Sequence, residues 1–230
     1  MNTTAKMAAA AFIAVAGLGW LVYDSSRPVP EENELANGRE YERVVVVGID
    51  LSGSFLHLMA DKGKAWEFLL RVIARYLRGN GNEKLILVQL SGNTGALLWD
   101  GTPAQLRKDF PDQEAFRKHL LSKADPNASR LHDGITESLE YLTTLSGVTP
   151  KTKCALLVLS DMDDNRSAPG SEQRLVQALS SFGKRGGAVG LYFVDQPFVN
   201  RWRANLGTAG VKHTVVEPSI VASPILPSFD

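Results

Sequence analysis

The sequence predicts a three-layer α/β fold in which helices cover both faces of a mostly parallel, six-stranded sheet with one antiparallel edge strand. Short β-branched runs alternate with amphipathic helical segments along the chain, and this alternation is typical of doubly wound α/β domains. The apolar runs are continuous, as expected for parallel strands that are buried on both faces. With 230 residues, of which 44% are hydrophobic, the chain is long enough for one sizeable core.

The first half of the domain is expected to begin with a central strand and to contain the antiparallel edge. Residues 43–49, Arg-Val-Val-Val-Val-Gly-Ile, predict that first strand. Residues 64–78 carry apolar side chains at three- and four-residue spacings and stop at a Gly-Asn-Gly sequence, which predicts an amphipathic helix. Residues 84–90 predict the second strand. A Ser-Gly-Asn turn then leads into residues 96–99, which predict a short hairpin partner at the sheet edge.

The second half of the chain continues the alternation and completes the sheet. Apolar residues at helical spacing mark the helices, and short continuous apolar runs mark the strands. These criteria predict helices over residues 103–110, 113–123, 132–145, 174–182 and 198–206, and strands over residues 153–160, 188–194 and 211–216.

The N-terminal segment predicts a membrane anchor. Residues 7–23 contain no charged side chain, Lys6 precedes them and Asp24 ends them, and a run of this length borders on a membrane span. Trp20 and Tyr23 stand where aromatic residues line a membrane interface. We therefore expect a single-pass membrane protein with a signal anchor or transmembrane helix in residues 1–24, a linker in residues 25–41, the folded domain in residues 42–217 and a C-terminal tail in residues 218–230.

A cleavable signal peptide is the alternative to the anchor, because Ala14, Val15 and Ala16 offer small residues at a cleavage site. The apolar run continues past this site to residue 23, which favours the uncleaved anchor. In our interpretation the folded domain then lies on the extracytoplasmic side of the membrane.

The overall charge is balanced and excludes a strong global attraction to polyanions. Lys and Arg together number 25, as do Asp and Glu, so no net field draws the chain to nucleic acid or to an anionic surface. The single cysteine, Cys154, lacks an internal disulfide partner and lies in an apolar run. It is therefore predicted to be a buried core thiol.

Several oxygen-bearing side chains lie in predicted loops at the carboxyl end of the predicted sheet. Asp50, Ser52 and Ser54 follow the first strand in one tight loop, Asp161 follows the fourth strand, and Ser129 precedes a helix. Binding sites in open α/β sheets gather at the carboxyl ends of the strands. Carboxylate and hydroxyl oxygens suit a hard cation such as Mg²⁺. The sequence therefore predicts a divalent-cation site at this edge.

The order and spacing of these residues resemble the von Willebrand factor A family, whose metal ion-dependent adhesion site joins an Asp-x-Ser-x-Ser loop, a threonine loop and an aspartate loop. Asp50, Ser52 and Ser54 match the first element, and Asp161 matches the third. Ser129 occupies the place of the usual threonine.

Two positions depart from the family pattern within the region of resemblance, which covers about residues 42–216. Ser129 keeps the hydroxyl oxygen of threonine but lacks the methyl group that restricts χ1, which predicts a looser site. Met162 stands where a glycine commonly follows the last aspartate, so the sequence leaves the shape of that loop open.

The resemblance implies a Rossmann-like fold and a non-enzymatic, protein-binding function. Asp50, Ser52, Ser54, Ser129 and Asp161 would hold Mg²⁺, Mn²⁺ or Ca²⁺, and a Glu or Asp carboxylate of a protein partner would complete the coordination of the ion. Two alternatives stay open. One is a Mg²⁺-dependent, phosphate-handling enzyme that uses Asp50 and Asp161, and the other is a metal-independent scaffold with the same fold.

The remaining polar candidates carry no recognisable chemistry. Asp163 and Asp164 extend the loop of Asp161 and are predicted to be solvated charges. No catalytic base can be assigned to the serines, so serine hydrolase chemistry is unsupported. The histidines show no metal-ligand spacing and are predicted to be surface or helix residues: His57, His119, His132 and His213.

Overall fold

The structure, a computed structural model, describes residues 40–76, 82–92, 97–124, 126, 129–218 and 226–227. The predicted anchor in residues 1–24 lies outside the described residues, as do most of the linker and most of the C-terminal tail. Within the described part, no helix is both long enough and apolar enough to cross a bilayer.

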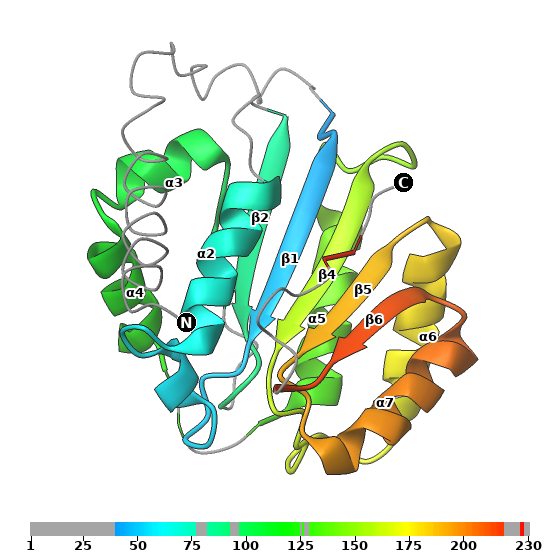
Figure 1. Cartoon of the computed structure of the whole chain (residues 1–230). Coiled ribbons are helices and arrows are strands. Elements are labelled where there is room, and N and C mark those ends of the chain that lie inside the picture. The colour runs from blue at the N-terminus through cyan, green and yellow to red at the C-terminus, as the bar shows by residue number, and fades with distance from the viewer. Residues whose placement is uncertain are drawn as a thin grey trace, which may run out of the picture.

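The described residues form a six-stranded sheet in the order β3-β2-β1-β4-β5-β6, with helices on both of its faces (Figure 1). β1 (Arg43–Ile49) lies between β2 (Glu83–Gln89) and β4 (Lys153–Leu159) and pairs with both in parallel. β5 (Ala188–Tyr192) and β6 (Lys212–Val216) continue the parallel part of the sheet.

The opposite edge is antiparallel, as the sequence predicts. β3 (Leu97–Gly101) pairs with β2 in antiparallel register. The expected α/β fold with a mixed sheet and one antiparallel edge strand is therefore confirmed.

Two apolar cores lie on the two faces of the sheet. Side chains of β1 point alternately to opposite faces, so Val45 and Val47 join one core while Val44 and Val46 join the other. All four are at most 1% exposed. The first core is covered by η2 (Leu56–Met59), α2 (Lys64–Tyr76), α3 (Pro103–Asp109) and α4 (Gln113–Ser122), and the second by α5 (Leu131–Thr144), α6 (Ser171–Lys184) and α7 (Gln196–Ala209).

The strand order places several loops together at the carboxyl end of β1. The chain runs outward from β1 to β2 and β3, and then returns to β4 on the other side of β1. Ile49 is paired with both Gln89 and Leu159, so the loops that follow these three residues leave the sheet at the same level. Such a point of reversal is where open α/β sheets carry their binding crevices.

Candidate metal centre

The loop after β1 is organised around the carboxylate of Asp50. Asp50 is fully buried, and its Oδ1 accepts a hydrogen bond from the Ser52 N–H at 2.9 Å. The Leu51 N–H donates to Ser91 Oγ at 3.1 Å. These bonds satisfy two backbone donors that the sheet no longer pairs, and they hold the start of the loop in place.

Two serines from other segments donate to the same carboxylate. Ser129 Oγ lies 3.2 Å from Asp50 Oδ1 and 3.1 Å from Oδ2, and Ser160 Oγ donates to Oδ2 at 2.8 Å. Burial raises the pKa of Asp50 and the charge of Asp161 adds to the rise, while hydrogen bonds from Ser52 and Ser160 oppose it. A negative charge at Asp50 is therefore costly unless a cation lies nearby.

The outer part of the loop is joined to Asp161. Ser52 Oγ lies 3.2 Å from Ser54 Oγ, which donates to Asp161 Oδ2 at 2.8 Å. Ser52 is buried, Asp161 is half-buried and Ser54 is exposed. The structure thus brings all the residues predicted from the sequence into one group, here called the oxygen cluster: Asp50, Ser52, Ser54, Ser129 and Asp161.

The oxygen cluster fits a hard divalent cation in donor type. Its side chains offer only carboxylate and hydroxyl oxygens, which suit Mg²⁺, Mn²⁺ or Ca²⁺. Its hydrogen-bonded oxygens are 2.8 to 3.2 Å apart. These are ordinary hydrogen-bond distances, so the donor type and the meeting of three loops, rather than the spacing, point to a cation.

Hydroxyl groups would share a cation at this position with the two carboxylates. Among the described residues, no group of three or more His, Cys, Asp or Glu side chains is arranged to hold a metal. Besides the two carboxylates, the serine hydroxyls are the protein oxygens of the cluster that could join an inner coordination sphere, with water in the remaining positions. The three hydroxyls are therefore direct targets for testing the site.

Met162 gives the loop after β4 a left-handed turn. Its φ is +68°, in a region that glycine adopts freely and other residues adopt at a cost of about 1–2 kcal/mol. The Met162 N–H donates to Ser160 Oγ at 2.8 Å, and its carbonyl accepts from Trp202 Nε1 at 3.3 Å. The Met162 side chain is also buried. Packing and hydrogen bonds therefore hold a turn that a glycine would adopt without strain.

Sequence reasoning missed Ser160 and Ser91. Ser160 donates directly to Asp50, and Ser91 Oγ accepts from Leu51 N–H and from Gln89 Nε2, each at 3.1 Å. Both serines stand just after the strands that flank β1. Their position directly after strands that neighbour the first strand could have identified them from the sequence.

The prediction that Asp164 is a solvated charge is wrong. Its side chain is 4% exposed, and its Oδ2 lies 2.7 Å from His132 Nδ1. Burial raises the pKa of Asp164, but hydrogen bonds from His132 and Ser167 outweigh burial and bring the pKa below its usual value. His132 lies in a helix, as predicted, but it is buried. Asp163 is exposed, in agreement with the prediction.

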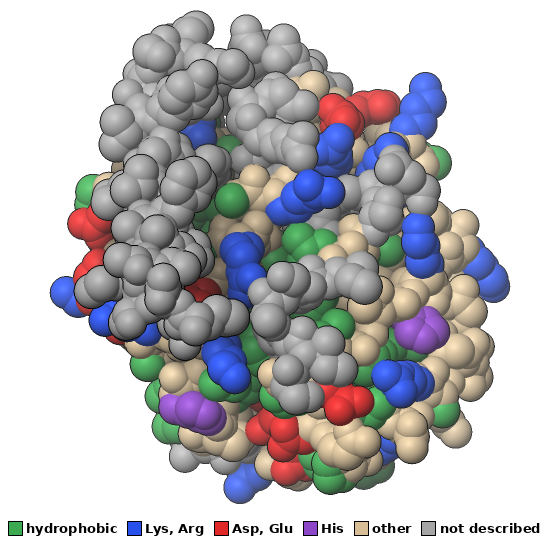
Figure 2. Space-filling model, in the orientation of Figure 1, with side chains coloured by type: hydrophobic (Ala, Val, Ile, Leu, Met, Phe, Trp, Pro, Cys, Tyr) green, Lys and Arg blue, Asp and Glu red, His purple; other side chains and the backbone are tan. Residues whose placement is uncertain are grey.

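Further acids surround the outer side of the oxygen cluster. The N–H of Asp195, after β5, donates to the carbonyl of Asp161 at 3.0 Å. Burial raises the pKa of Asp195, and the charges of Asp161 and Asp163 add to this rise. Acidic side chains are visible in Figure 2 at the lower end of the molecule, where the strands of Figure 1 end. Their negative potential favours the approach of a cation.

A groove elsewhere on the molecule is separate from the oxygen cluster. It has a volume of about 440 Å³ and lies between α5 and α6, where Leu139, Phe182 and Cys154 line it. No member of the oxygen cluster lines this groove. Cys154 is half-buried rather than a fully buried core thiol. Burial raises the pKa of this thiol, against the opposing charge of Arg185.

Several solved structures have a fold similar to that of this chain. The VWA domain of SpRpn10 matches with a TM-score of 0.55 and 11% identity, over 78% of this chain and 92% of that domain. The N-terminal domain of TFIIH p34 matches with a TM-score of 0.50 and 13% identity, over 76% and 90%. The pilus adhesin SpaC from Lactobacillus rhamnosus GG matches with a TM-score of 0.51 and 13% identity, over 80% and 29%. No family model and no curated protein matches the sequence.

Proposed function

We propose that this chain, which has the fold of a von Willebrand factor A domain, is a non-enzymatic binding module that holds a divalent cation in its oxygen cluster. Through this cation it binds an acidic side chain of a protein partner. Mg²⁺ is the proposed ion, and Mn²⁺ or Ca²⁺ can replace it. The observation that carries the proposal is the meeting of carboxylate and hydroxyl oxygens from three loops in one hydrogen-bonded group, a donor set that suits such an ion.

The burial of the oxygen cluster supports a ligand that arrives from outside. Asp50 and Ser129 are buried, whereas Ser54 is exposed. A cation in the cluster would therefore be closed off on the protein side and open beside Ser54. The two carboxylates of the cluster carry two negative charges, which equal but do not exceed the charge of a divalent ion. An incoming carboxylate would therefore meet no excess of negative charge and could still bind the electrophilic ion. Charge-assisted contacts of this kind are short and directional, which allows a small interface to be specific.

The electrostatics of Asp50 also support a bound cation. The hydrogen bonds that its carboxylate accepts come from neutral groups of Ser52, Ser129 and Ser160. Burial keeps the pKa of Asp50 above its usual value. A divalent cation would supply the missing positive charge and return the carboxyl to its ionised form.

A metal-independent scaffold is the second candidate, and one observation favours it. The Ser129 hydroxyl lies within hydrogen-bond distance of both oxygens of Asp50, the Ser52 N–H donates to one of them, and the Ser160 hydroxyl donates to the other. Such a network can hold the loops together without an ion. A partner of the scaffold would then bind equally well in the presence and in the absence of Mg²⁺.

The proposal also places the module on a membrane anchor, with the folded domain outside the cytoplasm. The anchor is supported by the uncharged run in residues 7–23, which is followed by a polar stretch in residues 25–41. A linker of this kind would keep the domain clear of the bilayer and leave the open side of the oxygen cluster accessible.

Calorimetric titration of the metal-free, full-length protein with Mg²⁺ tests the cation site. Asp161→Ala is expected to remove measurable binding. Asp163→Ala is the matched control, because it deletes an exposed acid of the same loop that contributes no side chain to the oxygen cluster. Equal Mg²⁺ affinity in wild type and in Asp161→Ala would refute the site.

Partner capture then tests what the cation does. Immobilised wild type and Asp161→Ala are incubated with cell extract in Mg²⁺ or in EDTA, and bound proteins are compared. Capture that requires both Mg²⁺ and Asp161, and that free glutamate weakens, supports the proposal. Capture that survives EDTA and the substitution favours the scaffold. Mg²⁺-dependent phosphate release from p-nitrophenyl phosphate would instead favour the phosphate-handling enzyme.

A further inference from the structure

The segment between β4 and α6 lies against the start of α5 and contacts it through Asp164. Asp164 Oδ1 accepts the Leu131 N–H at 3.1 Å, and Oδ2 lies 2.7 Å from His132 Nδ1. The side chains of this pair are 4% and 5% exposed. Arg130, the residue before α5, provides no side-chain cap. Asp164 therefore acts as the cap from a different part of the chain.

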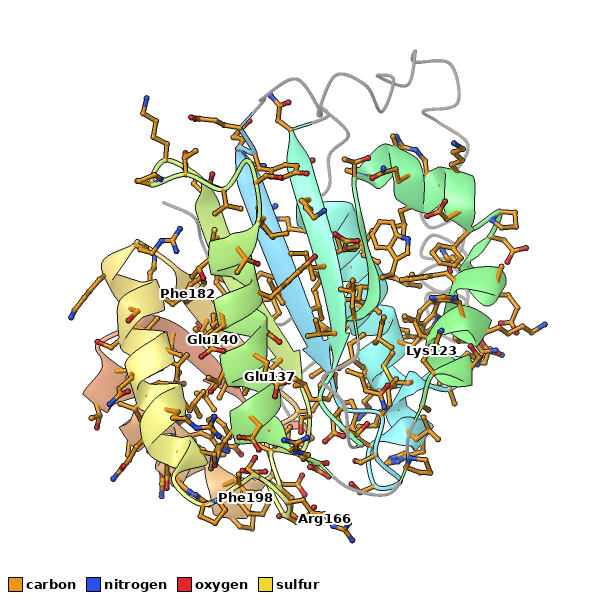
Figure 3. All side chains as sticks on the ribbon, turned by 180° about the vertical axis from the view of Figure 1, so that it is seen from behind. Lys123, Glu137, Glu140, Arg166, Phe182 and Phe198 are labelled. Carbon is orange, nitrogen blue, oxygen red and sulfur yellow. The ribbon has the colours of Figure 1, made fainter. Side chains whose placement is uncertain are left out.

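Ser167 and Asp133 strengthen the same junction. Ser167 Oγ accepts the N–H groups of His132 and Asp133 at 3.1 and 3.4 Å. In return, the Ala168 N–H donates to Asp133 Oδ2 at 3.0 Å. The first three N–H groups of α5 thus all find acceptors in the segment after β4. Figure 3 shows this end of α5 from behind, with Arg166 of that segment beside it.

The junction connects two loops of the oxygen cluster. Ser129 stands just before α5, and Asp161 stands just before Asp164. The carbonyl of Ser129 accepts the Arg166 N–H at 3.2 Å, and its N–H lies 3.4 Å from Asn165 Oδ1. The segment that carries Asp161 therefore also fixes the backbone at Ser129.

We propose that Asp164 and His132 are positioning residues, whose contact holds the loop of Asp161 against the loop of Ser129 and thereby sets the cation affinity of the oxygen cluster. The inference rests on the cation site proposed above. The parallel pairing of β1 with β4 aligns the loops of Asp50 and Asp161, whereas the loop of Ser129 follows α4, so contacts between the loops must fix its position against Asp161. Ligand groups have to be held within about 0.5 Å of their working geometry, which a buried hydrogen-bonded pair can achieve.

His132 contributes a donor rather than a catalytic base. Asp164 Oδ2 and Ser171 Oγ both lie against Nδ1, at 2.7 and 3.2 Å. Nε2 has no hydrogen-bond partner among the described residues, and the ring packs against Trp202 with centroids 5.3 Å apart. A Ser-His-Asp triad needs its serine and its carboxylate on opposite ring nitrogens. This arrangement lacks that division and instead locks the ring in place.

Four variants of the full-length protein separate positioning from charge. Asp164→Ala removes the contact, whereas Asp163→Ala removes an equal charge from the exposed neighbour. His132→Asn keeps an amide donor near the place of Nδ1, whereas His132→Gln carries its amide toward the place of Nε2. Calorimetry with Mg²⁺ should show a loss of affinity of about ten-fold or more for Asp164→Ala and His132→Gln. Asp163→Ala and His132→Asn should lose at most about five-fold.

Hydrogen exchange at the Leu131 amide gives a second readout that needs no cation. Followed by NMR, this amide should exchange about ten-fold faster in Asp164→Ala and at the wild-type rate in Asp163→Ala. Equal Mg²⁺ affinity in Asp164→Ala and Asp163→Ala would overturn the proposal. If Asp164→Ala does not fold, the comparison of His132→Asn with His132→Gln decides, and equal affinities again overturn it.

The two proposals fail in different ways. If wild type binds no Mg²⁺, the cation site itself is refuted. Faster exchange at Leu131 in Asp164→Ala would then still uphold the coupling of the two loops. Unchanged exchange would overturn that coupling as well.

Discussion

Replacing Asp50 with asparagine should leave the cation-free protein at least as stable as wild type and remove its response to Mg²⁺. Burial raises the pKa of Asp50, with a further rise from Asp161 and opposition from hydrogen bonds of Ser52 and Ser160. A carboxyl with a raised pKa binds its proton more tightly in the folded state. Its charged form therefore costs stability at neutral pH. Asparagine keeps the shape of the side chain and removes this cost.

The pH dependence in EDTA follows from the same shift. Below the usual aspartate pKa of 3.8, the Asp50 carboxyl is protonated in both the folded and the unfolded state and costs nothing. The cost grows as the pH rises from there through the raised pKa of the folded state, and it is constant above that. The unfolding free energy of Asp50→Asn relative to wild type should therefore increase with pH across this window.

The response to Mg²⁺ has a defined size. A ligand at 100 times its Kd stabilises the folded state by about 2.7 kcal/mol. One kcal/mol moves the Tm of a domain of this length by about 2–4 °C. Wild type should therefore gain about 5–11 °C in saturating Mg²⁺, and Asp50→Asn should gain nothing.

Thermal and urea unfolding, followed by circular dichroism in EDTA and in Mg²⁺, measure both effects. Asp163→Asn is the control, because it removes one negative charge near the oxygen cluster without entering it. An Asp50→Asn protein that gains as much in Mg²⁺ as wild type does would show that Asp50 does not bind the ion. A loss of more than about 1 kcal/mol in EDTA would show that the charge of Asp50 is already compensated.

Three further predictions concern single features. Ser129→Thr should retain or tighten Mg²⁺ binding because its methyl group restricts the hydroxyl, and Ser129→Ala should weaken it; equal affinities by calorimetry would show that this hydroxyl is not a ligand. Met162→Gly should lower the unfolding free energy, measured by urea denaturation, by up to about 4 kcal/mol, because losing a buried methionine costs about 2–5 kcal/mol and relieving the left-handed turn returns only about 1–2 kcal/mol. A more stable variant would contradict this balance. Removing residues 1–26 should release the protein from membranes that otherwise retain it in carbonate, and soluble full-length protein with an intact N-terminus would rule out the anchor.

The fold was predictable where burial leaves a local pattern. β1 has the predicted bounds, because a β-branched run covered on both faces is distinctive by itself. α6 begins three residues earlier than expected, at Ser171 rather than at residue 174. Its first turn follows Gly170 at φ +77° with no side-chain cap, so the usual start signal is missing. The short η2 was not expected, since four residues are too few to show a helical period.

The oxygen cluster was predictable because its first element is local in sequence, strand order supplies Asp161, and the family pattern supplies Ser129. Asp50, Ser52 and Ser54 share one loop, and the ends of parallel strands bring Asp161 to it. The pairing of Asp164 with His132 was not predictable. The sequence separation of Asp164 and His132 does not reveal that Asp164 caps the helix that contains His132. This contact depends on how the loop after β4 folds back over α5.

The long separation of the paired segments has a consequence for the time course of folding. The bond from Ser160 to Asp50 spans 110 residues, and the bond from Ser54 to Asp161 spans 107. Contacts between such distant segments close late, after the entropy of a long loop has been overcome. During synthesis, Asp50 leaves the ribosome well before the partners that surround it in the finished domain. The nascent chain therefore exposes an isolated aspartate loop, and the oxygen cluster forms only when β4 has docked against β1.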